Sequence, residues 1–178
     1  MRNSLKTTFF AFIVLGIAAP VVAQDTQLDC AFDKTAEAVR TELLAKLMDG
    51  SLGTVAEEGD AESRMYDAVR LCAKEAGRTG EKEYAFFDLT QARILASASR
   101  AELVREQFPI GELEKSWNVT WPSGAPDPAT FTDDQWAEME AWVRATNNPE
   151  DALEIAGQVS TYLMLHRAGA SAYETLSE

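Results

Sequence analysis

Apolar residues recur every three or four positions through most of the chain after residue 27, which is the spacing of one face of an α-helix. Five stretches follow this spacing: 28–48, 60–77, 81–108, 132–145 and 148–169. Only residues 117–121 could alternate as a strand. The pattern therefore predicts an all-α, single-domain bundle of five helices, or six if the third stretch divides.

Glycines and caps subdivide the first half of this pattern. Residues 50–59 hold three glycines and no apolar period, so we expect a loop there, followed by Asp60 as the cap of the second helix. Ser99 and Glu102 match a capping box, which would start a new helix inside the third stretch. The apolar set expected to face the core from this stretch is Tyr84, Phe87, Ile94, Leu95, Ala98, Leu103 and Val104.

The start of the fourth helix carries a strong local signal. Thr132 and Gln135 form a capping box, and Phe131 and Trp136 flank it at the two positions of a hydrophobic staple. A staple residue packs against its partner where the chain enters the helix. We therefore expect a helix from residue 132 to about residue 145, with Trp136 in the core.

The last helix is expected to begin with Asn148 as its cap and Pro149 at its first position. Gly169 is placed to end it, which would leave a frayed tail. His166, the only histidine of the chain, falls on its apolar face. The simplest interpretation of His166 is a buried histidine of the core.

Residues 109–131 form the least regular segment. They include four of the six prolines and two of the four tryptophans. A connection of this length inside a small domain is uncommon and is often functional or folded over the core as a lid. We therefore predict one long irregular connection in an otherwise short-looped bundle.

The N-terminus is typical of a secretory signal peptide. Arg2 and Lys6 supply a positive segment, residues 9–17 are apolar, and residues 21–23 (Val-Val-Ala) suit signal-peptidase cleavage. The apolar run is too short to span a bilayer. The sequence thus predicts a signal peptide at 1–23, a mature α-helical domain at 24–178, and a periplasmic or secreted location.

The charge balance excludes several partners. The net charge of the chain is −13, and it becomes −15 once a signal peptide with two basic and no acidic residues is removed. Nucleic acids and anionic membrane surfaces are bound through Lys and Arg, so neither is expected as a partner. A protein with a basic surface remains compatible with this charge.

Cys30 and Cys72 are the only cysteines, and an oxidising compartment favours a bond between them. Cys30 lies near the start of the first predicted helix and Cys72 in the last turn of the second. These two ends are neighbours in an antiparallel hairpin. We therefore predict a structural Cys30–Cys72 disulfide.

Recognisable catalytic or cofactor chemistry is sparse. A lone histidine excludes His-rich zinc sites, and the chain has none of the common nucleophile, phosphate-loop or dinucleotide motifs. A haem held between His166 and Met48 or Met65 has no supporting motif. The acidic residues are too numerous for any pair to stand out. We expect no cofactor and no metal.

The four tryptophans all lie between residues 117 and 142. Trp117, Trp121 and Trp142 fit the pattern of buried positions less clearly than Trp136 does. Tryptophan is also frequent at binding hot spots. The leading hypothesis is a non-enzymatic protein-interaction module, similar in size, charge and compartment to secreted inhibitors or immunity proteins, in which these three residues contact the partner. The alternatives are a small-molecule or glycan binder with the same residues in a cleft, and a carboxylate-based hydrolase.

Overall fold

The computed structural model describes residues 21–53, 59–122 and 124–178, with side chains from residue 28 onward. The all-α prediction is confirmed: these residues form seven α-helices and two short 3₁₀ helices, without a strand. The α-helices are α1 (Val21–Lys34), α2 (Glu37–Met48), α3 (Ala61–Glu75), α4 (Glu81–Arg105), α5 (Ile110–Ser116), α6 (Asp133–Arg144) and α7 (Ala152–Ser177). The 3₁₀ helices are η1 (Pro128–Thr130) and η2 (Pro149–Asp151).

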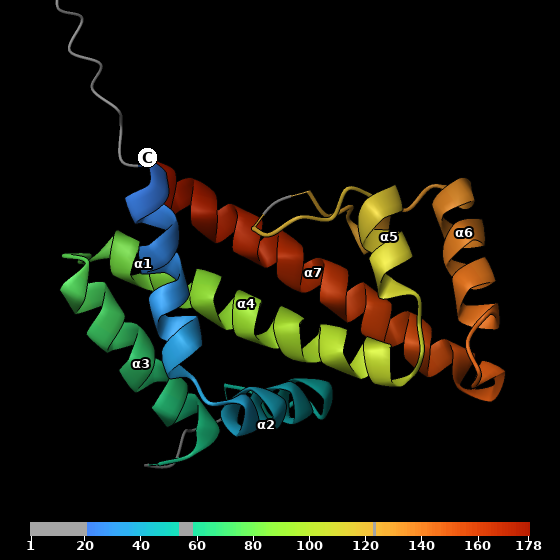
Figure 1. Cartoon of the computed structure of the whole chain (residues 1–178), viewed down its shortest axis with the longest axis horizontal. Coiled ribbons are helices and arrows are strands. Elements are labelled where there is room, and N and C mark those ends of the chain that lie inside the picture. Colours follow the sequence, from blue (N-terminus) through green and yellow to red (C-terminus); the bar gives the residue numbers. More distant parts are fainter. Residues whose placement is uncertain (1–20, 54–58, 123) are drawn as a thin grey trace, which may run out of the picture.

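The two longest helices, α4 and α7, pack against each other along the middle of the molecule. Figure 1 shows α1 and α3 toward one end of this pair, α2 beside the middle of α4, and α5 and α6 toward the other end. Each end has its own cluster of buried side chains, so α4 and α7 contribute to two adjoining cores.

We call the first cluster the disulfide core, because it contains Cys72, with Phe86, Leu43, Met65 and Ile94 among its fully buried members. The second, the aromatic core, is built on Leu103, Leu113, Met139, Ile155 and Leu163. The rings of Trp117, Phe131 and Trp142 pack against the aromatic core. Trp121 packs against both cores.

The predicted Cys30–Cys72 disulfide is confirmed and joins α1 to α3, with the two Cα atoms 6.0 Å apart. The first predicted helix is divided, however. Thr35 and Ala36 separate α1 from α2, and Arg40 donates a hydrogen bond to the carbonyl oxygen of Thr35 (3.1 Å). Both helices bury an apolar face, which is why the apolar spacing alone did not reveal the break.

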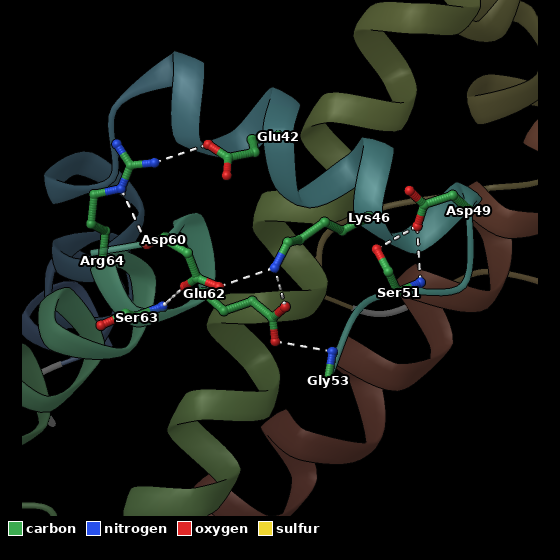
Figure 2. A network of polar contacts seen from close by, with 9 residues as sticks. All are labelled: Glu42, Lys46, Asp49, Ser51, Gly53, Asp60, Glu62, Ser63 and Arg64. Atoms are coloured by element: carbon green, nitrogen blue, oxygen red, sulfur yellow. Dashed lines mark hydrogen bonds and ion pairs between the residues drawn. The ribbon is translucent and has the colours of Figure 1, made fainter. Parts of the chain in front are cut away.

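Asp60 caps α3 as predicted, its carboxylate accepting a hydrogen bond from the Ser63 backbone N–H (2.8 Å). Figure 2 shows that Lys46 of α2 reaches across to Asp60 (3.1 Å) and Glu62 (2.9 Å). The hydrogen bonds that Lys46 donates to Glu62 and Asp60 raise the pKa of its ammonium group. Glu62 also accepts from the Gly53 backbone (3.0 Å), so this polar network joins α2 to α3 beside the connection between them.

The expected break at Ser99 is wrong, because α4 is continuous from Glu81 to Arg105. Ser99 is 3% exposed and packs against the bundle inside α4, whereas an N-cap residue has a non-helical backbone at the start of a helix. Tyr84 and Val104 were also misplaced in the core, since they are 72% and 52% exposed. Phe86 takes the inward position near Tyr84 instead.

The connection at 109–131 is partly helical, since it contains α5 and η1. The strand considered at 117–121 is not formed. The last helix does not end at Gly169 but continues to Ser177, and Ala172 and Leu176 are buried in the disulfide core. Burial of these side chains holds the C-terminal turns in helical form.

Residues 1–20 of the predicted signal peptide lie outside the described residues, and residues 21–23 belong to the first turn of α1. Among the described helices, we find none with the length and hydropathy needed to cross a bilayer.

Candidate functional site

The structure separates the three tryptophans that the sequence singled out. Trp117 and Trp142 lie together, with ring centroids 5.5 Å apart, at the edge of the aromatic core. The Trp117 indole N–H donates a hydrogen bond to Glu138 (2.7 Å), and its ring meets that of Phe131 edge-on at 5.1 Å. These contacts give both side chains a structural role in holding the connection and α6 to the bundle.

The expected contacts at the start of α6 are formed, but the expected burial of Trp136 is wrong. The capping box of Thr132 and Gln135 is formed, and the Phe131 and Trp136 rings are in contact at 5.1 Å. The Trp136 side chain is nevertheless 43% exposed rather than buried in the core. Met139 and Val143 are the residues of α6 that are buried.

Trp121 lies elsewhere, over the middle of α7. Its ring meets the His166 imidazole edge-on at 5.4 Å. A Cβ atom added to Gly169 would come within 2.6 Å of the Trp121 ring, so the absence of a side chain at Gly169 makes room for the indole.

Beside Trp121 lies a cavity of about 380 Å³, which we call the His166 cavity. Its lining comes from α4, α5, α7, Val119, Trp121 and Phe32 of α1, and it is open to solvent on one side. The polar and aromatic residues around it are Phe32, Arg93, Ser97, Arg100, Glu114, Trp121, Tyr162 and His166. The cavity thus lies where the two cores adjoin.

Three of these residues form a fixed polar network on one side of the cavity. Arg100 donates two hydrogen bonds to the Glu114 carboxylate (2.7 and 3.0 Å), and the Tyr162 hydroxyl donates a third (2.6 Å). Burial alone would raise the pKa of Glu114, but the hydrogen bonds from Arg100 and Tyr162 outweigh it and lower the pKa. Burial and the Glu114 contact raise the pKa of Tyr162 far above its ordinary value. Glu114 is therefore ionised and Tyr162 neutral near pH 7.

His166 is only 5% exposed, and its Nδ1 atom has no hydrogen-bond partner among the described residues. Burial lowers the pKa of the imidazole, while the Thr120 backbone and the Glu114 charge act in the opposite direction. The ring is consequently neutral near pH 7. A buried nitrogen without a partner costs about 1–3 kcal/mol, which makes His166 an unusual core residue.

Arg93 lies on another side of the cavity. It forms an ion pair with Asp29 of α1, and its guanidinium carbon lies 4.8 Å from the ring centre of Phe32 and 6.0 Å from that of Trp121. Arginine stacks readily on aromatic faces. These contacts hold the cation beside Trp121.

Sequence reasoning had singled out Trp121 and His166 in this cavity but missed Arg93, Arg100, Glu114 and Tyr162. The spacing of residues along the sequence did, however, indicate which members of two pairs lie on the same helix face. Arg93 and Arg100 are seven positions apart on α4, and Tyr162 and His166 are four apart on α7, so each pair shares one helix face. The rings of Tyr162 and His166 are indeed 4.6 Å apart.

The cavity lining does not favour the haem alternative, because no methionine is among the described residues around it. Met48 is 50% exposed, and Met65 is buried within the disulfide core. The one cluster with metal-like spacing in the described part of the chain is Cys30, Cys72 and Glu75. Two of these three residues are joined in the disulfide and are not thiolate ligands.

The site offers cationic, aromatic and hydrogen-bonding groups around a space large enough for a small molecule. Comparisons of the chain with protein-family models, with curated proteins and with solved structures gave no match.

Proposed function

We propose that this protein is a non-enzymatic binder of a small organic anion, which it holds in the His166 cavity. The carboxylate or similar group of the ligand lies toward Arg93 and Arg100, and its apolar part lies against Trp121. With the predicted signal peptide, binding would take place in the periplasm or outside the cell.

The observation that carries this proposal is the buried Nδ1 atom of His166, which lacks a partner among the described residues beside a lined cavity. Binding sites for small molecules are typically apolar and aromatic spaces of about 300–1,000 Å³ with a few convergent polar groups. The His166 cavity, at about 380 Å³, lies within this range.

The charge of the lining favours an anion. Two arginines and one carboxylate border the cavity, so its lining holds more cations than anions in a chain whose net charge is −13, and Asp29, the partner of Arg93, lies outside the lining. Arg100 is already held by Glu114, which keeps its guanidinium in place before a ligand arrives. A preorganised cation loses less conformational entropy on binding.

The same lining disfavours the paired-carboxylate hydrolase considered from the sequence. Such an enzyme needs two acids facing one cleft, one of them with a raised pKa. Glu114 is the only acid among the described lining residues, and its pKa is lowered. This is the chemistry of a fixed counter-ion rather than of a proton donor.

The test is a titration followed by tryptophan fluorescence and calorimetry, with 4-hydroxybenzoate as the probe and benzamide as its neutral counterpart. We expect saturable one-to-one binding of the anion, and binding about tenfold weaker or more in Arg93→Gln, which corresponds to about 1.4 kcal/mol. Trp121→Phe should weaken binding as well.

Trp136→Phe is the matched control, because Trp136 does not line the cavity. This variant should bind the probe as the unaltered protein does. Absence of saturable binding for 4-hydroxybenzoate, benzoate and acetate alike would contradict the proposal. Binding that is unchanged in both Arg93→Gln and Trp121→Phe would do so too.

A further inference from the structure

A second hollow of about 390 Å³, which we call the α6–α7 groove, lies between α6 and the start of α7. Trp136 and Leu153 line it, together with the buried Met139 and Val143 and the small Ala156. Leu153 is 88% exposed, the most exposed large apolar side chain among the described residues. Two large apolar side chains therefore meet solvent at one groove, which is a common property of docking sites.

The segment of the chain that supplies the lining of this groove is strongly acidic. Residues 133–154 contain seven acidic residues and one arginine, and six of the seven acids are exposed. The single arginine, Arg144, is paired with Glu140 (3.2 Å), and both side chains line the groove. Roughly half of the negative net charge of the chain thus lies in the segment that supplies the lining of this groove.

We infer that the α6–α7 groove docks a basic amphipathic helix of another protein. Apolar side chains on one face of that helix would insert beside Trp136 and Leu153, while its Lys and Arg residues would face the acids around the groove. A second copy of this chain fits poorly, because a symmetric contact through the groove would bring two equally acidic surfaces together.

The probe is a labelled peptide of about 14 residues in which leucine recurs every three or four positions and lysine fills the rest, so that it is a basic amphipathic helix. A peptide with glutamate in place of lysine is the charge control. We expect saturable one-to-one binding of the lysine peptide, measured by fluorescence anisotropy, and no binding of the glutamate peptide.

Leu153→Ser tests the apolar contact without a risk to folding, because the side chain is almost fully exposed. Because the leucine side chain would be buried against the peptide, this variant should bind the peptide about tenfold more weakly or worse. Met164→Ser is the matched control on the same helix: Met164 is 53% exposed and does not line the groove, and its loss should leave binding unchanged.

The charge contribution is tested by the combined change Glu150→Gln, Asp151→Asn and Glu154→Gln. Binding should weaken and depend less on salt than in a control with Asp33→Asn, Asp67→Asn and Glu112→Gln, which are exposed acids elsewhere. Equal effects of the two triple changes would overturn the proposed docking site. Peptide affinity that is unchanged in Leu153→Ser would overturn it as well. A dimer of the unaltered protein that Leu153→Ser dissociates would identify a second copy as the occupant and would also overturn the inference.

These variants leave the His166 cavity intact. Failure of the peptide to bind would therefore not affect the proposal of a small-anion site, and failure of 4-hydroxybenzoate to bind would not affect the docking site.

Discussion

The two cores that share α4 and α7 are held together by different means. The disulfide core is built largely of aliphatic side chains around Phe86, and a covalent bond ties α1 to α3 beside it. The aromatic core has no covalent link among its described residues, and the rings of Trp117, Phe131 and Trp142 cover its edge. The disulfide core is thus stabilised in part because the bond restricts the unfolded chain. The aromatic core is stabilised by the buried area and the fit of its packed rings.

The two proposed binding sites differ in where they lie relative to the disulfide core and the aromatic core. The His166 cavity lies where the two cores adjoin, and Trp121 packs against both. The α6–α7 groove belongs to the end without the disulfide. If the two ends behave as separate cooperative units, changes at one end should leave the other largely intact.

The largest expected effect comes from removing the disulfide with Cys30→Ala and Cys72→Ala. The bond spans 42 positions, so the chain-entropy model predicts a loss of about 4 kcal/mol in the free energy of unfolding. Urea unfolding measures the loss, and hydrogen exchange should show weaker protection in α1 and α3 than in α5 and α6. Equal loss of protection at both ends would contradict the distinction.

Leu113→Ala perturbs the aromatic core instead, because Leu113 is fully buried there. Truncation of a buried leucine costs about 2–5 kcal/mol, and we expect about 3 kcal/mol. Combined with loss of the disulfide, the two free-energy changes should add within about 0.5 kcal/mol if the sites are independent. A larger deviation from additivity would mean that the two cores unfold as one.

Gly169→Ala tests the contact between α7 and Trp121. The added Cβ would lie 2.6 Å from the indole, so the ring must move. We expect a loss of about 1–3 kcal/mol in the free energy of unfolding and a change in tryptophan fluorescence. The matched control is Gly157→Ala on the same helix, where nothing lies within 4 Å. That substitution should stabilise by about 0.5–1 kcal/mol, and a loss there would point to a general effect on α7.

The smallest expected effect concerns pH. Burial lowers the pKa of His166 in the folded protein, against the opposing effects of the Thr120 backbone and Glu114. As the pH falls below about 6.5, the unfolded chain therefore takes up the proton first, and the folded state loses stability until its own lower pKa is reached.

Because His166 is the only histidine, His166→Asn isolates this contribution. Between about pH 7.5 and pH 5.5 the unaltered protein should lose more free energy of unfolding than the variant, by less than about 1.4 kcal/mol per pH unit. Urea unfolding at the two pH values measures both losses. Identical pH dependence in the two proteins would show that the histidine titrates alike in the folded and unfolded states.

Local signals predicted the elements whose ends depend on neighbouring residues. Asp60 caps α3, and Thr132 and Gln135 cap α6, because each cap needs only a backbone N–H three positions away. The same reasoning failed at Ser99, where burial against the rest of the bundle keeps α4 continuous. It also failed at Gly169, where the glycine makes room for an indole from a distant segment rather than ending a helix.

For the candidate site, Trp121 and His166 were each identified from the sequence, but their contact could not be predicted from it. Their contact requires the connection after α5 to fold back over α7, and Arg93, Arg100 and Glu114 join them only through the packing of α4, α5 and α7. Side-chain spacing along one helix is a property of the sequence, whereas a cavity depends on which faces of several helices meet.

The sequence by itself therefore determined the helical class, the caps of α3 and α6, and the two cysteines available for a bond. The tertiary structure decided which tryptophans are structural, which one borders a cavity, and that Trp136 is exposed. The physical reason is range: helix formation and capping act over three or four residues, while burial depends on contacts between residues far apart in the chain.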